Sequence, residues 1–262
     1  MIRLISYLTI VLLTCSCMLE EHDMNMVGGE QIEFTSSKTR IITKGGDEAQ
    51  TFDTGTAFRL FAVTSGSDWS MNGTKFYNIE GIGESGGKVG YSIDGKLASY
   101  DVGSNLDFYG VTYGSTTEVS VNGTAGTAPT VPVSMHDGEL PDLMYSDNLK
   151  AKTSSSGLLR MEFRHAMSKI NFEILKQDES GDDDQKLTDA ILKKVVLIGT
   201  SVSGTFNIDT GLWEDTSVQD RTVYEGSLPI GVEAQTFSNL IAMPSGGQVS
   251  LRVYLDGIED GQ

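Results

Sequence analysis

Two alternating runs, placed back to back, constrain the fold of this chain more than any other stretch. They lie within residues 156–175, SGLLRMEFRHAMSKINFEIL. The apolar residues that alternate with polar ones are Leu159, Met161 and Phe163 in the first run and Ile170, Phe172 and Ile174 in the second. A period of two predicts half-buried β-strands. The link at 165–168 fits either a tight connection or a kink within one long bent strand.

The rest of the chain repeats this signal in short pieces. Its 262 residues, with 30 Gly but 5 Pro, suit one large or two ordinary domains. Turn signals such as Asn72-Gly73 and Asp94-Gly95 separate apolar bursts. The expected strands are 31–36, 57–64, 75–79, 88–93, 96–100, 105–113, 118–121, 193–199, 202–208, 222–228, 236–243 and 248–255. This spacing predicts an all-β protein of sandwich or barrel type.

Charge and cysteine content exclude several classes of function. A net charge of −17 without a basic cluster argues against a nucleic-acid partner, which would require grouped Lys and Arg. The two cysteines, Cys15 and Cys17, precede the folded body. The body therefore offers no disulfide framework, cysteine zinc site or thiol nucleophile.

No catalytic, cofactor or metal constellation emerges from the remaining motifs. The histidines His22, His136 and His165 are scattered and show no HExxH spacing. A Gly-x-Ser-x-Gly match at 83–87 lacks the preceding apolar strand and following helix of a nucleophile elbow. The aspartates at 182–184 lack the spacing of an EF-hand loop. We expect a protein that is not an enzyme.

The N-terminal sequence is typical of an export signal that ends at a cysteine. Residues 1–16 hold Arg3, a short apolar core and small residues before Cys17, and the core is too short to span a bilayer. This pattern predicts a lipoprotein signal peptide with lipidation at Cys17. Cys15 is the second choice, and a plain secretory signal is the alternative.

Three segments together carry a family resemblance. FRHAMSKINFEI at 163–174, PDLMYSDN at 141–148 and the aromatic NLDFYGVTY at 105–113 occur in this order. The chain thereby resembles the fimbrillins of Bacteroidales, the surface pilins and related lipoproteins. The resemblance implies two consecutive transthyretin-like β-sandwich domains. It also implies a surface-exposed lipoprotein of the outer membrane or a fimbrium, held in the membrane through its N-terminal lipid.

The same resemblance implies a maturation step and a partner. Fimbrillins lose a leader to an arginine- or lysine-directed protease, and the groove left behind accepts a strand from another fimbrial subunit. Arg40 is the first candidate for the cut and Lys44 the second, with 31–36 as the displaced strand. We therefore expect a structural or adhesive fimbrial subunit, which is a stalk pilin, a tip component or an anchor.

The expected domains are a signal peptide at 1–16, an acidic tether and leader at 17–50, and sandwiches at 51–157 and 158–262. The polar tract AKTSSS at 151–156 suggests the boundary between the sandwiches. The second sandwich is expected to be C-terminally truncated, because no strand follows Asp256-Gly257.

The alternative function is a non-assembling lipoprotein that binds a glycan, a host ligand or another bacterial surface ligand. Its candidate aromatic residues are Trp69, Phe108, Tyr109, Tyr113 and Trp213, of which Trp213 is expected to be exposed.

Overall fold

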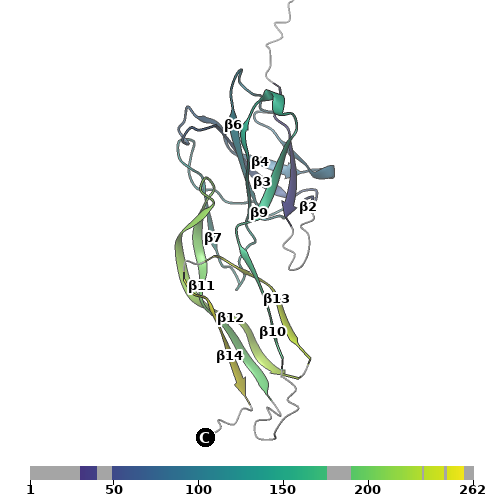
Figure 1. Cartoon of the computed structure of the whole chain (residues 1–262), viewed down its shortest axis with the longest axis vertical. Helices are drawn as coiled ribbons and strands as arrows, with labels where there is room; N and C mark the ends of the chain where they lie inside the picture. The colour runs from purple at the N-terminus through teal and green to yellow at the C-terminus, as the bar shows by residue number, and fades with distance from the viewer. Residues whose placement is uncertain (1–29, 40–48, 176–189, 232, 245–246, 257–262) are drawn as a thin grey trace, which may run out of the picture.

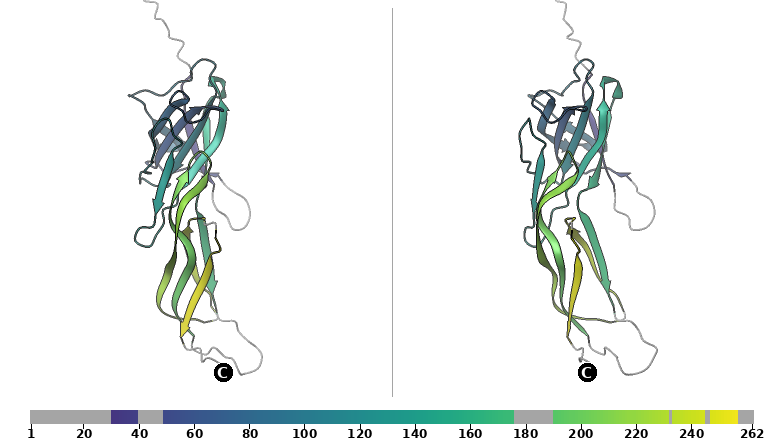
Figure 2. Two further views of the ribbon diagram at one scale, coloured as in Figure 1. Left: turned by 90° about the vertical axis from the view of Figure 1, so that its left-hand side faces the viewer. Right: turned by 60° about the vertical axis from the view of Figure 1, so that its left-hand side comes forward.

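The computed structural model describes residues 30–39, 49–175, 190–231, 233–244 and 247–256. Within these ranges the regular structure is fourteen β-strands and two short 3-10 turns, η1 (Ser85–Gly87) and η2 (Ser154–Ser156), without an α-helix. No helix of the described chain is long and apolar enough to cross a membrane. The all-β prediction is confirmed. The molecule is elongated, with a compact group of strands at one end and longer strands at the other (Figures 1 and 2).

The compact end is a closed barrel. Its sheet runs in the order β2-β1-β5-β4-β3-β6-β8-β9, and β1 also pairs with β9, so that seven strands form a ring. The strands are β1 (Phe34–Thr39), β2 (Ala49–Gln50), β3 (Ala57–Thr64), β4 (Thr74–Gly83), β5 (Lys88–Tyr91), β6 (Leu106–Thr112), β8 (Met144–Lys152) and β9 (Leu159–His165). Closure of this kind removes the free edges that an open sheet would present.

The longer end consists of two smaller sheets. One has the order β12-β11-β14, with β7 pairing along part of β11, and the other is the pair β10-β13. These strands are β7 (Thr130–Ser134), β10 (Ser168–Ile174), β11 (Ile191–Asn207), β12 (Leu212–Pro229), β13 (Gln235–Ala242) and β14 (Ser250–Asp256). The two sheets lie on either side of the lower half in Figure 1.

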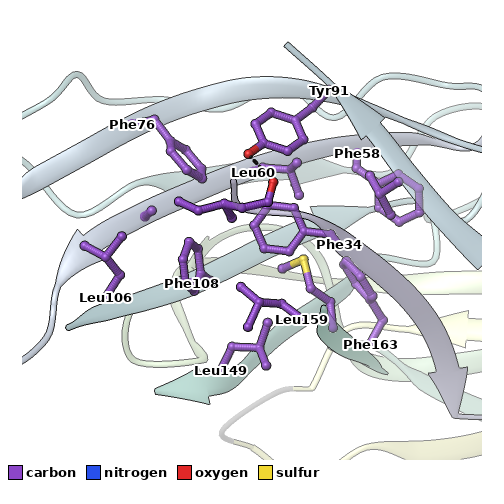
Figure 3. Packing of buried hydrophobic residues seen from close by; sticks show 14 of the residues in the cluster. Phe34, Phe58, Leu60, Phe76, Tyr91, Leu106, Phe108, Leu149, Leu159 and Phe163 are labelled. Carbon is purple, nitrogen blue, oxygen red and sulfur yellow. Dashed lines mark hydrogen bonds between the residues drawn. The ribbon is translucent and has the colours of Figure 1, made fainter. Parts of the chain in front are cut away.

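Aromatic side chains fill the inside of the barrel. Phe58, Phe108 and Phe163 are at most 1 % exposed and come from three different strands. Figure 3 shows them around Phe34, together with leucines of β3, β6, β8 and β9. Gly110 of β6 makes room for this packing, because a Cβ there would lie 2.7 Å from the Met161 Cε atom.

A second core joins the two ends. On β3 and β6, residues such as Phe61 and Val111 point out of the barrel yet are fully buried. They pack in one cluster with Val131 of β7 and Phe206 of β11. Because β3 and β6 are buried on both faces, the outer face of the barrel and the β7–β11 pair pack together in this second core and are not joined by a flexible linker alone.

The central stretch divides between the two ends. The first run forms β9 in the barrel and the second forms β10 in the two-stranded sheet, so the 165–168 link connects two sheets. The polar tract at 151–156 spans the end of β8 and η2, and the chain then returns to the same sheet as β9. The barrel sheet therefore continues past residue 157, where the expected domain boundary falls.

Several expectations on individual elements were wrong. Where a first sandwich was expected, β1 bridges β5 and β9 and closes a barrel. The segments 193–199 and 202–208 are one continuous strand, β11, whose register with β12 shifts at several points. Segments 96–100 and 118–121 form isolated bridges or no strand. Strands β7 and β8 were not expected.

Candidate functional site

Strand β1 holds the barrel closed through its two edges. On one side it pairs with β9 in parallel over five positions, from Phe34 opposite Leu159 to Lys38 opposite Phe163. On the other side it pairs antiparallel with β5 and then with β2. The β1–β9 pair is the one parallel pair among the described strands. The ring exists because β1 occupies this position.

Buried apolar side chains hold the start of β1, and the residues just before it, in the barrel core. Ile32 is fully buried, and Phe34 is 2 % exposed. The Phe34 ring packs against the rings of Phe108 and Tyr91, at centroid distances of 5.3 and 5.5 Å (Figure 3). The Tyr91 hydroxyl donates to the Ile32 carbonyl oxygen at 2.8 Å. Burial raises the pKa of Tyr91 to about 12.

The C-terminal end of β1 is held by polar contacts instead. The Ser36 hydroxyl donates to the Gly87 carbonyl oxygen at 3.3 Å. The Arg160 Nε donates to the Ser37 hydroxyl at 3.3 Å. The Lys38 ammonium lies 5.3 Å from the centre of the Phe52 ring. Buried apolar side chains therefore contribute more to holding the start of β1 than its end.

Removal of β1 would leave a groove between β9 and β5. Five backbone positions on β9 would lose their ladder partners. If residues 30–33, which precede β1, left with it, the sites of Ile32 and Phe34 would become apolar pockets two residues apart. Such a groove suits an incoming strand with apolar residues at alternate positions. The expected displaced strand, 31–36, overlaps β1, which begins at Phe34 and ends at Thr39. Its first residues pair instead with the segment before Tyr100.

The expected lipidation and cleavage residues lie outside the described residues. This applies to Cys17, to Cys15, and to both cleavage candidates, Arg40 and Lys44. The position of Arg40 in the sequence is nevertheless informative, because it directly follows Thr39, the last residue of β1. A cut after Arg40 would sever the whole of β1 from the rest of the barrel.

An exposed strand edge lies at the end of the molecule away from the barrel. Strand β14 pairs with β11 and with no other described strand. Its residues Leu251 and Val253 are 42 % and 37 % exposed, although their partners Leu197 and Val195 on β11 are buried. Directly opposed residues of an antiparallel pair share a face. The inner face of the sheet is therefore covered over β11 and uncovered over β14.

Side chains of β12 contact β13 and connect the two sheets at this end. The rings of Tyr224 and Phe237 lie 5.6 Å apart, centre to centre. Arg221 is 8 % exposed, and its Nη1 donates to the Ile241 carbonyl oxygen at 2.7 Å. Burial lowers the pKa of this guanidinium. These contacts lie at the β12 edge of the sheet, opposite the uncovered β14 edge.

The other motifs take ordinary structural places. The Gly-x-Ser-x-Gly match at 83–87 spans the last residue of β4 and the turn η1, which leads into β5. His136 is exposed, with its Nε2 atom 3.2 Å from a carboxylate oxygen of Asp137. His165 Nδ1 lies 2.8 Å from Asp142 Oδ1. His22 and the aspartates at 182–184 lie outside the described residues. Among described residues, no group of three or more His, Cys, Asp or Glu could hold a metal ion.

Most of the candidate sugar-binding aromatics belong to the core. Trp69, Phe108 and Tyr109 are at most 6 % exposed, so they cannot form an exposed binding face. Trp213 remains partly exposed, as expected. It lies beside Tyr145 of β8, a residue that sequence reasoning did not select because β8 lacks strict alternation.

Comparison with known proteins agrees with the three sequence motifs. The family model described as fimbrillin-like matches residues 39–259. Among curated proteins, none matches this chain. Two crystal structures of proteins to which a cell adhesion role has been attributed are similar. The first, from Bacteroides ovatus, has 15% identity and a TM-score of 0.49, with 87% of this chain and 86% of that chain covered. The second, from Bacteroides uniformis, has 14% identity and a TM-score of 0.48, with coverage of 87% and 81%. Because the family model spans well over half of the sequence, the chain belongs to the fimbrillin-like family.

Proposed function

We propose that this protein is a structural and adhesive subunit of a cell-surface fimbria that assembles by β-strand addition. In this proposal residues 1–16 are a signal peptide and Cys17 carries the lipid that holds the precursor on the outer membrane. Residues 17–50 contain the removable leader. The proposal rests on family membership and on one structural observation, the closure of the barrel by a single strand that ends at Thr39.

Proteolysis would convert this closing strand into an exchangeable one. A cut after Arg40, or after Lys44 as the second choice, leaves β1 attached to the barrel only by non-covalent contacts: its backbone ladders, the buried Ile32 and Phe34, and the polar contacts of its C-terminal end. A strand from a neighbouring subunit can then replace it between β9 and β5. Backbone hydrogen bonds along β9 would provide continuity, and the apolar sites two residues apart would set the register.

The C-terminal sheets fit the same role. We assign the layers β12-β11-β14 and β10-β13 to an incomplete sandwich of the transthyretin-like type expected from the family. The uncovered inner residues of β14, Leu251 and Val253, support this assignment. Such a body carries load through its strands, and the fimbrillin-like family is one of structural proteins rather than enzymes.

Limited proteolysis of the purified protein tests the assembly step. Treatment with an arginine-specific protease is expected to cut after Arg40 and to convert the monomer into oligomers, as followed by light scattering. The Arg40→Gln variant should remain monomeric under the same treatment. A synthetic peptide of residues 30–40, added in excess, should cap the groove and prevent oligomer formation. A cut chain that stays monomeric without the peptide would refute assembly by strand addition.

A second function, ligand binding by a non-assembling surface lipoprotein, is favoured by one observation. Trp213 is partly exposed in a pocket, whereas the other tryptophan, Trp69, is buried in the core. This function predicts no leader removal and a persistent lipid at Cys17. The native N-terminus distinguishes it from the first.

A further inference from the structure

A shallow pocket lies where the β11–β12 hairpin meets the barrel. Its volume is about 380 Å³, and it is open to solvent. Segments distant in the sequence line it: Tyr145 on β8, His165 at the end of β9, Leu212 and Trp213 at the start of β12, and Pro244 after β13. The pocket exists only because these strands from both ends of the molecule come together.

The aromatic walls of this pocket are fixed in place. The Trp213 Nε1 donates to the Ala166 carbonyl oxygen at 2.9 Å, and its ring lies 5.2 Å from the Phe206 ring. The Tyr145 ring is held between Phe206, at 4.7 Å, and the Arg164 guanidinium, at 4.4 Å. A preformed wall loses little conformational entropy when a ligand binds.

Hydrogen-bonding groups stand next to the apolar wall. His165 Nδ1 and Asp142 Oδ1 lie 2.8 Å apart, which fixes the imidazole ring at the pocket. Leu212, at the tip of the hairpin, is 63 % exposed although the barrel is adjacent. Because Leu212 also lines the pocket, its side chain can give a bound ligand an apolar contact at the rim.

The indole ring, the polar groups beside it and the volume of the pocket together favour a sugar as the ligand. The face of an indole ring is electronegative, so it attracts the slightly positive C–H bonds on one face of a pyranose ring. The sugar hydroxyls can exchange hydrogen bonds with the His165 and Asp142 groups at the edge. The volume is at the low end of the range of about 300–1,000 Å³ typical of small-molecule sites, which suits one sugar residue rather than a lipid chain.

Charge argues against an anionic ligand. The guanidinium of Arg164 is engaged by Asp147 at 2.7 Å. Asp142 adds a carboxylate beside the pocket, and the chain as a whole carries a net charge of −17. A phosphate or a sugar acid would meet this negative field at close range.

From this geometry we infer that the pocket binds a single pyranose residue of a neutral glycan, with the sugar ring stacked on Trp213 and its hydroxyls directed toward His165 and Asp142. The inference names a ligand class for the adhesive part of the proposed function and rests on it for its biological meaning. It does not depend on leader removal, since none of the lining residues belongs to β1.

Tryptophan fluorescence tests this inference directly, because the chain has only Trp69 and Trp213. In a Trp69→Phe variant of the full chain, the remaining emission reports on the pocket. The probes are methyl β-glucopyranoside, methyl β-galactopyranoside and N-acetylglucosamine. At least one is expected to give a saturable change in the emission of Trp213.

Two further variants show whether the fluorescence response comes from binding in this pocket. Leu212→Ser, made in the Trp69→Phe background, should weaken the saturable binding by at least about threefold, because the exposed side chain contributes contact but no core packing. The matched control is Val218→Ser on the same strand, where the side chain is 55 % exposed and lies outside the pocket; it should leave affinity unchanged.

Failure of all three sugars to give saturation would overturn the inference. So would a saturable response that Leu212→Ser does not weaken. Sialic acid serves as a fourth, anionic probe, and saturation by it alone would show an anionic site and also overturn the inference. Because binding is measured on the uncleaved chain, any of these results leaves assembly by strand addition standing.

Discussion

Replacement of Phe34 by alanine is the sharpest test of how β1 is held. The side chain is 2 % exposed and contacts the rings of Tyr91 and Phe108, while the backbone ladders of β1 do not depend on it. Truncation of a buried phenylalanine leaves a cavity and costs about 3–5 kcal/mol. Domains of this type have total stabilities of about 5–15 kcal/mol, so the loss would be a large share.

Urea unfolding followed by tryptophan fluorescence measures this loss. The matched control is Glu33→Ala, because Glu33 is the exposed neighbour of Phe34 and should change the free energy of unfolding by no more than about 0.5 kcal/mol. A loss below about 1 kcal/mol for Phe34→Ala would show that Phe34 is not seated in the barrel core. It would thereby refute the reasoning on β1 as the closing strand.

The same difference should appear when the strand is supplied in trans. For the chain cut after Arg40, a peptide of residues 30–40 that carries Phe34→Ala should bind the groove roughly a hundredfold to a few thousandfold more weakly than the unmodified peptide. The Glu33→Ala peptide should bind within about threefold of it. Equal binding of all three peptides would mean that the backbone alone holds the strand.

Other consequences follow from residues in the two cores and can be measured independently. Gly110→Ala should destabilise the protein by about 1–3 kcal/mol in urea unfolding, because the added Cβ would lie 2.7 Å from the Met161 Cε atom; an unchanged midpoint would contradict the packing. Tyr109→Phe removes a hydroxyl that donates to Asp209 at 3.0 Å and ties the barrel to the β11–β12 hairpin. It should cost about 1.5–3 kcal/mol, whereas Tyr254→Phe on β14, 43 % exposed, should cost almost nothing. Burial raises the pKa of Tyr91 from the ordinary tyrosine value of 10.0 to about 12. The folded state therefore binds this proton more tightly, so the stabilising contribution is complete below pH 10.0 and is lost as the pH rises toward about 12. Tyrosinate absorbance should show a corresponding late-titrating group that Tyr91→Phe removes.

Strict alternation made part of the fold predictable. The strand expected at 57–64, an apolar burst without strict alternation, has the bounds of β3. The two strictly alternating runs of the central stretch are β9 and β10. In these runs an apolar side chain at every second position leaves one plausible arrangement, a half-buried strand. The all-β class followed from many such pieces.

Strands buried in irregular patterns escaped prediction. β7 contains Pro132, which normally argues against a strand that pairs on both sides. It is tolerated here because β7 pairs with β11 and with no other described strand. β8 begins with three successive buried residues, from Met144 to Ser146, so it lacks a period of two. Its neighbours, rather than its own sequence, determine its burial.

The closure of the barrel could not be read from the sequence for a different reason. The pairing of Phe34 with Leu159 joins positions far apart in the chain, and nothing local to either position specifies a parallel partner. The strand expected to be displaced, 31–36, overlaps β1, but its pairing with β9 and the resulting closure of a barrel were not predicted. In the same way, Trp213 was singled out for exposure, whereas the pocket that it forms with Tyr145 and His165 depends on three separate strands.

The central claim is that β1 is a removable closing strand. Intact mass and N-terminal sequencing of the protein recovered from its native cell surface test it most directly. We expect a chain that begins at Ile41, or at Gly45 if the cut follows Lys44. A chain that still begins at an acylated Cys17 would contradict leader removal and leave an anchored surface lipoprotein in its place.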